Sequence, residues 1–514
     1  MATFRRQRHR AQRVGFLAML VAAGLVSAAV VPVGRADERW TVSIVEHGAR
    51  PGKPCGPAIQ AAIEQAANNG GGTVVVPPGR WITGTIQLKS NVTLHVATGA
   101  TLQGSPNLAD YPPHPSSDLH FENRRSLIYA ENAENISITG GGVIDGNGRA
   151  FWRDPKPGSR WYRAKERPTP MIELRRCRGV RLKDVRIANS PGWTVHPYCC
   201  DEVVIDGVSV KNHLFGPNTD GFDINGCRDV QISDCRLVCG DDAIIIKATP
   251  NSRSTERVAI TNCIIQTNCI GVGIGQETQS DVRQVAVSNC VFQKCHRLFA
   301  IGIWDGGVVE DVTVTGLVGD SLAYYPLARP IQLEVKQHLD IPRTRPLGVI
   351  RNVNISNVNC RTQGRILVTA QEGGAIENVS LRDVRLAYVH LEDAAALSPA
   401  DGKTGSSQYA NRNLFARRQC AAVVVENAKN IACTDLSVHW PAPGAPTTAK
   451  ELPPDGAVAP LRDDPPYRLL WARGVDGLEF TAPLSRASRD EIDATHVEDC
   501  RNCRFHVEHR PAGD

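Results

Sequence analysis

A short phrase recurs through the middle of the chain, in which apolar residues alternate with polar ones and an Asn, Asp or Gly follows. Five copies begin at Val203, Val230, Val258, Val285 and Val312, so successive copies start 27, 28, 27 and 27 residues apart. Further copies begin at Ile136, Val180, Val353 and Val379. Alternation with a period of two, rich in Val and Ile and bounded by turn residues, is typical of β-strands. A fixed period in the twenties indicates a solenoid.

The segments between the copies carry no long helical pattern, which disfavours repeats that combine strands with helices. We therefore predict an all-β fold, a right-handed parallel β-helix, in which each coil pairs with the coils before and after it. Inward residues then stack in columns. Cys235, Cys263 and Cys290 hold the same repeat position, so we expect them to be free buried thiols in one column.

The two ends of a solenoid need caps, because an open end is an unpaired sheet edge. Residues Pro57 to Ala67 have the apolar spacing of one short amphipathic helix, which suits an N-terminal cap. After Val389 the repeat fades into an Ala-, Ser- and Gly-rich loop at 391–413 and a Pro-rich excursion at 441–466. Short apolar runs at 423–427 and 469–471 predict further irregular coils. We expect a catalytic β-helix over 37–390 and these C-terminal elements over 391–514.

The first 36 residues contain six Arg and no acid. Within them, an Arg-rich start is followed by an apolar run from Val14 to Val33 and by small residues up to Ala36. This layout predicts a signal peptide over 1–36 and a secreted or periplasmic protein. An uncleaved membrane anchor is the alternative, since about 20 apolar residues span a bilayer. Removing these six bases from the 58 Lys and Arg leaves 52 against 53 acids. That balance argues against a nucleic-acid partner, and we expect a monomer without membrane contact beyond the signal segment.

Two acidic phrases, Asn218-Thr219-Asp220 and Gly240-Asp241-Asp242, lie about one coil apart. Residues one coil apart sit on adjacent strands, roughly 4.8 Å from each other. Repulsion among three crowded carboxylates raises the pKa of at least one of them. That group then serves as a proton donor while the others stay ionised. Glycoside hydrolases typically use a carboxylic acid as the proton donor and a carboxylate as the base or nucleophile. Clustered carboxylates also bind Ca²⁺, which is the other functional interpretation.

These phrases, together with Phe222-Asp223 and Ala243-Ile244-Ile245-Ile246-Lys247, resemble glycoside hydrolase family 28, the polygalacturonase family. Similar runs lie upstream, at 71–79, 88–94 and 190–197, so the resemblance covers roughly residues 42–390. It implies inverting hydrolysis of pectin-type glycosides on a right-handed β-helix, with neither cofactor nor metal. By the same resemblance Asp241 is the general acid, and Asp220 and Asp242 hold and deprotonate the attacking water.

The chain departs from this family at two places. Cys269 stands where the His of a Gly-His-Gly motif is expected. The family's Arg-x-Lys phrase, which holds a galacturonate carboxylate, is replaced by Phe299-Ala300-Ile301-Gly302-Ile303-Trp304. Because Arg and Lys are the natural partners of a carboxylate, losing both puts the substrate in question. Arg329 and Lys336 are candidate replacements.

The substrate-binding candidates are polar or aromatic residues near these phrases. They are His196, Asn218, Lys247, Glu277 and Trp304. Trp304 suits stacking on a sugar face, with a packed core aromatic as the alternative. Cys269 is more consistent with a buried thiol than with a nucleophile, because no His lies near it in the sequence.

Three functions remain open, and we favour the first. It is an exported inverting hydrolase of a pectin-like or related polysaccharide or oligosaccharide, exo-acting if the loops at 153–166 and 391–413 close one end of the cleft. The second is a β-helix polysaccharide lyase, which needs a base and commonly Ca²⁺. The third is a carbohydrate-binding β-helix without catalysis, consistent with the two missing motifs.

Overall fold

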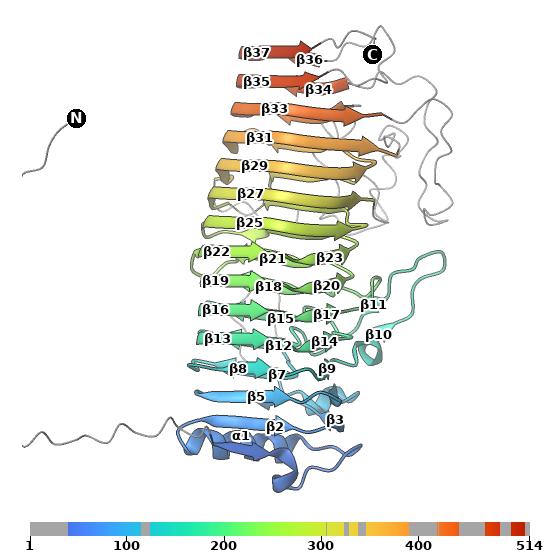
Figure 1. The fold of residues 1–514 in the computed structure, drawn as a ribbon, viewed down its shortest axis with the longest axis vertical. Coiled ribbons are helices and arrows are strands. Elements are labelled where there is room, and N and C mark those ends of the chain that lie inside the picture. The colour runs from blue at the N-terminus through green and yellow to red at the C-terminus, as the bar shows by residue number, and fades with distance from the viewer. Residues whose placement is uncertain are drawn as a thin grey trace, which may run out of the picture. The chain divides into compact units, whose positions relative to one another are not determined.

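The repeat folds as a right-handed parallel β-helix, which confirms the predicted fold class (Figure 1). The computed structural model describes residues 40–114, 124–304, 306–322, 328–337, 346–389, 419, 421–440, 468–483 and 495–508. The predicted signal segment and the excursions at 391–413 and 441–466 lie outside the described residues. Among the described helices, none is long and apolar enough to cross a membrane.

Successive copies of the repeat pair directly, so the sequence period is the coil period. Val203 pairs with Val230, Val230 with Val258, Val258 with Val285, and Val285 with Val312. All of these pairings are parallel. The copies at Val353 and Val379 continue the same column.

The strands form two long parallel sheets that run along the stack. The smaller sheet has 13 strands, namely β4 (Ile86–Gln87), β7 (Ile128–Glu131), β12 (Ile172–Arg175), β15 (Val195–Tyr198), β18 (Phe222–Asn225), β21 (Ile244–Ala248), β24 (Ile270–Thr278), β26 (Arg297–Ile303), β28 (Ile331–Val335), β30 (Ile366–Ala370), β32 (Ala421–Glu426), β34 (Arg468–Arg473) and β36 (Thr495–Glu498).

The larger sheet has 22 strands and begins as two columns. The first column is β1 (Thr41–Ser43), β2 (Gly72–Val76), β5 (Val92–Val96), β8 (Ser137–Thr139), β13 (Arg178–Lys183), β16 (Asp201–Asp206), β19 (Arg228–Ser233) and β22 (Thr255–Thr261). The second is β3 (Gly79–Thr83), β6 (Ala100–Gly104), β9 (Val143–Asp145), β14 (Arg186–Ala188), β17 (Ser209–Lys211), β20 (Arg236–Cys239) and β23 (Ile264–Thr267). The columns merge in β25 (Val282–Gln293), β27 (Val308–Ser321), β29 (Val349–Thr362), β31 (Ala375–Tyr388), β33 (Lys429–His439), β35 (Asp476–Pro483) and β37 (Arg501–Glu508).

The turn residues of the repeat bend the chain from one strand column to the next. Asp234, Asn262 and Asn289 have φ of 56°, 56° and 54°, and Gly316 continues the column at 69°. Asn, Asp and Gly tolerate this left-handed conformation better than other residues. The Asn262 amide Nδ2 also donates to Asp234 Oδ1 at 3.2 Å, so neighbouring turns hold each other.

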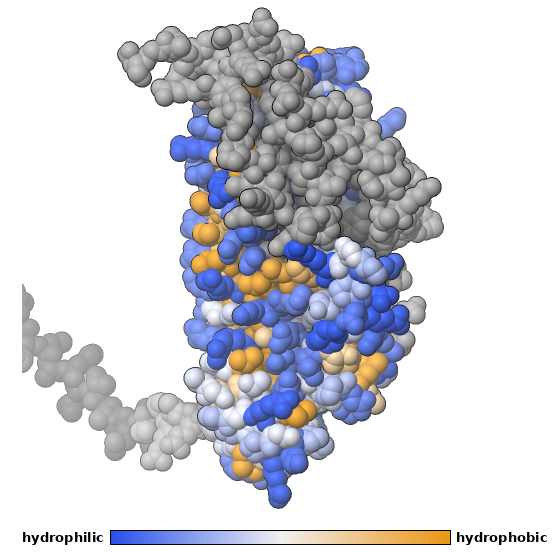
Figure 2. All heavy atoms as spheres, turned by 90° about the vertical axis from the view of Figure 1, so that its right-hand side faces the viewer, coloured by the Kyte–Doolittle hydropathy of each residue, from blue (hydrophilic) through white to orange (hydrophobic). Residues whose placement is uncertain are grey.

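Alternate residues of each strand fill the interior. Val230 and Ile232 of β19 are buried, and so are Val258 and Ile260 of β22. Cys235, Cys263 and Cys290 stack in this interior as free thiols, as predicted. Polar side chains cover most of the described surface that faces the viewer in Figure 2, and apolar ones gather near the middle of its height.

The N-terminal end is capped by α1 (Gly56–Asn68), which confirms the helix predicted at 57–67. Pro57 lies in its first turn, where its missing N–H costs nothing. The helix buries Ile59, Ala62, Ile63 and Ala66 against the first coils, at the blue end of Figure 1. Short 3₁₀ turns lie at η1 (Ile44–His47), η2 (Leu108–Asp110) and η3 (Gly148–Phe151), and one antiparallel hairpin, β10 (Trp152–Arg153) with β11 (Arg163–Ala164), leaves the stack.

We expect Ile260→Ala to lower the free energy of unfolding by about 2–4 kcal/mol, because it leaves a cavity that the stacked coils cannot close. Thermal and urea unfolding measure the loss. Ala259→Ser, one residue away on the exposed face of the same strand, is the matched control and should change stability by less than about 0.5 kcal/mol. Equal effects of the two substitutions would contradict the inward assignment of Ile260.

Candidate active site

The two acidic phrases meet at the start of adjacent strands of the smaller sheet. Phe222 of β18 pairs with Ile244 of β21, so Asp220 and Asp242, each two residues earlier, occupy equivalent positions on neighbouring coils. The Gly221 N–H donates to the Asp242 carbonyl at 2.9 Å. The coil partner of Asp220 is thus Asp242, with Asp241 one residue before it. The register between β18 and β21 therefore brings Asp220, Asp241 and Asp242 together, as predicted.

The glycine of Gly240-Asp241-Asp242 is required by close packing between the two phrases. A Cβ at Gly240 would lie 2.4 Å from the Thr219 hydroxyl and 2.7 Å from the His213 carbonyl. Instead, the Gly240 N–H donates to Thr219 Oγ1 at 3.1 Å. The small residue lets the second acidic turn lie directly against the first.

A fourth carboxylate joins the three that the sequence indicated. Asp223 of β18 is fully buried, and neither of its oxygens has a hydrogen-bond partner. Asp220 is 3% exposed and Asp242 is 8% exposed, whereas Asp241 is more accessible. Asp223 stands in the quoted phrase, three residues after Asp220, yet nothing in the repeat marked it as buried beside the other acids.

Burial and mutual repulsion favour the protonated form of several of these acids. Burial raises the pKa of Asp220 well above its ordinary range, and the charges of Asp223, Asp241 and Asp242 add to the effect. Burial likewise raises the pKa of Asp223. Burial, followed by the Asp242 charge, raises the pKa of Asp241 to about 6, against the pull of hydrogen bonds from Cys269 and Asn218. Asp241 is therefore a proton donor at mildly acidic pH.

Lys247 is the buried cation of the cluster. Its Nζ lies 2.5 Å from Glu277 Oε2, 4.0 Å from Asp223 Oδ1 and 4.8 Å from the Trp193 ring centroid. Burial works to lower the pKa of Lys247, but the charges of Glu277 and Asp223 outweigh it and raise the pKa above its usual value. Lys247 and Glu277, both predicted as substrate-binding residues, form an ion pair with each other beside the acids.

Asn218 and Cys269 flank the acid pair. Asn218 is exposed, and its Nδ2 donates to Asp241 Oδ2 at 3.3 Å. The Cys269 Sγ and carboxylate oxygens of Asp241 and Asp242 lie within 4.8 Å of one another. Burial and these two carboxylates raise the pKa of Cys269 well above its usual value, so the thiol keeps its proton. The Ile270 N–H donates to Asp242 Oδ1 at 3.0 Å.

His196 is enclosed by polar neighbours in this structure, and that it contacts substrate stays a prediction. Its side chain is fully buried, with Nδ1 3.0 Å from Glu173 Oε2 and 3.0 Å from Arg124 Nη1. Arg124 also contacts both Glu173 oxygens, at 2.7 and 2.9 Å. His196 was predicted as a substrate-binding residue from the family resemblance, and neither that resemblance nor the repeat indicated that Arg124 and Glu173 enclose its ring.

Cations also lie on the coils that follow the acids. Arg297 Nε and Arg329 Nη1 both donate to Gln332 Oε1, at 2.6 and 2.7 Å. Arg297 Nη1 also reaches Cys269 Sγ at 3.6 Å, which connects this pair to the acid cluster. Farther along, Lys336 Nζ lies 4.3 Å from the Trp304 ring centroid. Trp304 is 7% exposed, which favours the packed alternative for this ring.

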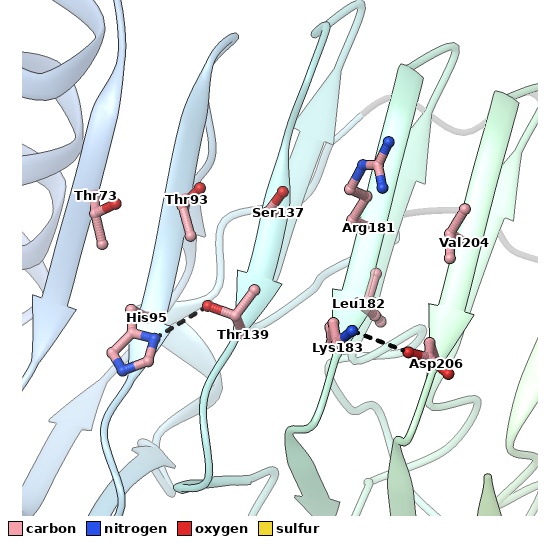
Figure 3. A pocket seen from close by; sticks show the side chains of 10 residues that line it. All are labelled: Thr73, Thr93, His95, Ser137, Thr139, Arg181, Leu182, Lys183, Val204 and Asp206. Atoms are coloured by element: carbon pink, nitrogen blue, oxygen red, sulfur yellow. Dashed lines mark hydrogen bonds and ion pairs between the residues drawn. The ribbon is translucent and has the colours of Figure 1, made fainter. Parts of the chain in front are cut away.

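A recess of about 530 Å³ lies elsewhere, on the outer face of the larger sheet (Figure 3). Hydroxyl and basic side chains line it, and Figure 3 shows His95 bonded to Thr139 and Lys183 paired with Asp206. Asp206 is its one acidic residue. Because hydrolysis by an acid and a base needs two carboxyl groups, this recess is not the candidate active site.

One further residue of the site was missed. Arg167, after β11, donates from Nη2 to Asn218 Oδ1 at 3.1 Å. It belongs to an irregular excursion with no repeat period, so no sequence pattern could place it beside the acids.

The chain belongs to glycosyl hydrolases family 28, whose model matches residues 68–399. A probable polygalacturonase of Vitis vinifera is 30% identical over 281 residues, which are 51% of this chain and 56% of that protein. An endo-polygalacturonase of Pectobacterium carotovorum subsp. carotovorum is 23% identical, over 63% of this chain and 83% of that protein. The match to the grape protein thus spans little more than half of its length.

The fold is also that of a solved enzyme. The crystal structure of a hyperthermoactive exopolygalacturonase from Thermotoga maritima superimposes with a TM-score of 0.61 at 22% identity, covering 78% of this chain and 92% of that one. The superposition confirms the fold, and the match of the family model to residues 68–399 confirms the family predicted from the sequence.

We expect Asp241→Asn to stabilise the fold more at pH 7 than at pH 4. The folded protein holds the Asp241 proton up to about pH 6, against an ordinary value of 3.8. Ionising Asp241 therefore costs stability as the pH rises through this range, and asparagine does not ionise. Thermal unfolding at the two pH values measures the difference.

Asp229→Asn is the control. Asp229 is exposed, and hydrogen bonds from Arg257 lower its pKa, so its substitution should cost a little stability at pH 7. A gain for Asp241→Asn that is equal at both pH values would contradict the raised pKa.

Proposed function

We propose that this protein is an exported hydrolase that cleaves pectin-type polysaccharides or oligosaccharides with inversion at the anomeric carbon. The observation that carries the proposal is the convergence of Asp220, Asp241 and Asp242 from adjacent coils, with Asp241 the most accessible. Membership of family 28 and the names of the curated relatives support the substrate class.

In the proposed mechanism Asp241 gives its proton to the glycosidic oxygen as the bond to the anomeric carbon breaks. Its raised pKa keeps that proton available at mildly acidic pH. Asp242 and Asp220, side by side on neighbouring coils, hold the attacking water and take its proton. Because the pKa of Asp220 is raised, Asp220 takes part as a base at a pH where it has ionised. The Ile270 N–H fixes one Asp242 oxygen, and Lys247 supplies the positive charge that four clustered acids need nearby. Attack from the face opposite the leaving group gives the inverted product.

We propose that Arg297 and Arg329 take over the role of the missing Arg-x-Lys phrase. Two guanidinium groups meet at one neutral amide oxygen, that of Gln332. Their joint positive charge suits a uronate carboxylate. Arg297 contacts Cys269, which in turn lies within 4.8 Å of the acid pair, so at least Arg297 is close to the acids.

We propose exo action, because the β10–β11 excursion is anchored beside the acids. The Tyr162 N–H donates to the Phe215 carbonyl at 3.0 Å, and the Trp161 and Phe215 rings meet edge to face with centroids 5.4 Å apart. Phe215 lies three residues before Asn218. A hairpin fixed at this place restricts the cleft on one side, which favours cleavage at chain ends.

Asp241→Asn should lower the release of reducing ends from polygalacturonate by about 10²–10⁴-fold, since it removes the general acid without a change of shape. The experiment follows product formation on a panel of plant polysaccharides, with product size and anomeric configuration read by NMR. Asp229→Asn, an exposed acid of the same stack, is the matched control and should keep full activity.

Other results would overturn the proposal. Turnover retained by Asp241→Asn excludes the assigned acid, and a product of retained configuration excludes inversion. An ultraviolet-absorbing unsaturated product, lost on chelation, identifies a lyase. Binding to a glycan without any product identifies a non-catalytic protein.

A further inference from the structure

Arg167 enters the active site from outside the repeat. It follows the β10–β11 hairpin, and its side chain passes over Gly192, where a Cβ would lie 2.8 Å from the Arg167 Nε. The stack therefore leaves room for this one guanidinium by having glycine at position 192. Arg167 is partly buried, and its Nε and Nη1 atoms are inaccessible to solvent.

The contact of Arg167 with Asn218 fixes the direction of the Asn218 amide. A guanidinium only donates hydrogen bonds, so the Asn218 atom that Arg167 Nη2 meets at 3.1 Å must be the carbonyl oxygen. The amide nitrogen of Asn218 is then turned to Asp241, where it donates to Oδ2 at 3.3 Å. Arg167 thereby orients the donor that holds the proposed general acid.

The hydrogen bond to Asn218 fixes the place of Arg167 in the site, and the positive charge of Arg167 attracts the Asp220 carboxylate. Burial lowers the pKa of Arg167 to about 10, against the opposite pull of the Asp220 carboxylate. At neutral pH the guanidinium is therefore positive. Within the described residues, Arg167 makes no ion pair within 4.0 Å, and its Nε and Nη1 and the Asp220 Oδ1 have no hydrogen-bond partner. A charge held in this way acts on Asp220 through space, in surroundings of low dielectric constant where such effects are strong.

We propose that Arg167 is a positioning residue of the hydrolytic site, which turns the Asn218 amide toward Asp241 and holds a positive charge beside Asp220. The inference rests on the proposed function. It gives the excursion after η3 a role in the chemistry, since the excursion delivers the cation that the coils themselves do not place on this side of the acids.

Other charged groups also act on the two acids. Asp220 is faced by Asp223, Asp241, Asp242 and Lys247, and by the buried thiol of Cys239. Asp241 is faced by Asp242, Lys247 and Cys269. Among these groups Lys247 is the one cation, and Glu277 neutralises it. Arg167 adds a second positive charge, which makes no ion pair within 4.0 Å among the described residues, so its removal leaves the paired Lys247 as the one cation of this group.

The test compares the dependence of kcat/KM on pH for wild type, Arg167→Met, Arg167→Lys and the control Lys165→Met. Lys165 is an exposed base two residues earlier in the same excursion. Without the Arg167 charge the Asp220 carboxylate ionises at higher pH, and without the oriented Asn218 donor so does Asp241. Arg167→Met should therefore move both limbs of the profile upward by about one pH unit and lower kcat/KM by about 10- to 100-fold.

Arg167→Lys keeps the positive charge but not the planar guanidinium. It should therefore return the acidic limb of the profile, set by Asp220, to its wild-type position, while the limb set by Asp241 stays shifted. Lys165→Met should match wild type. If Arg167→Met is folded and less active with both limbs unmoved, Arg167 has a structural role only and the inference is overturned. Wild-type protein that releases no product from any substrate refutes the proposed function instead.

A measurement of stability tests the inference without activity. Because the Arg167 charge attracts only the ionised form of Asp220, the deficit in Tm of Arg167→Met relative to Lys165→Met should grow as the pH rises from 4 to 8, by about 2 °C or more. A deficit that is constant over this range overturns the inference, even if the enzyme hydrolyses nothing that is tested. If Arg167→Met fails to fold, Arg167→Gln, which keeps a donor but no charge, replaces it in both experiments.

Discussion

Backbone pairing between successive coils is the constraint on which the rest of the structure depends. Each strand bonds to the strand one coil later at a spacing of roughly 4.8 Å. Residues at the same repeat position are therefore held in straight columns, whether they are core valines or the acids of the candidate site. The register that pairs Phe222 with Ile244 brings Asp220 to Asp242 without any long-range search. The site is a local irregularity in a structure that is otherwise repeated.

The same backbone pairing explains why several of these acids have raised pKa values. Four carboxyl groups converge on one buried lysine, and that lysine is already paired with Glu277. Such a cluster is stable only if some of its members keep their protons, which is why the pKa values of Asp220, Asp223 and Asp241 all rise. Carboxyl groups that keep their protons are the source of protons that the proposed hydrolysis needs, and the fold produces them by crowding the acids together.

The periodic parts of the molecule could be predicted from the sequence, and the aperiodic parts could not. The spacing of Val203, Val230 and Val258 in the sequence is the register with which their strands pair. The same spacing predicted that the acids converge. The burial of His196 could not be predicted, because alternation and family resemblance do not tell which outward side chains other parts of the chain cover. Arg167 was missed because its position depends on the path of an excursion, and no repeat constrains that path.

The column of Cys235, Cys263 and Cys290 makes the outcome of folding depend on when the chain is oxidised. In the finished stack these sulfurs are sealed from solvent, one coil apart. Adjacent coils bring Cα atoms within the range that a disulfide bridges, and three thiols in a row cannot all find partners. A crosslink made while the polypeptide is still open would tie together segments that belong on different coils. We therefore expect a chain that is oxidised before it winds to fold less efficiently than one that is oxidised afterwards.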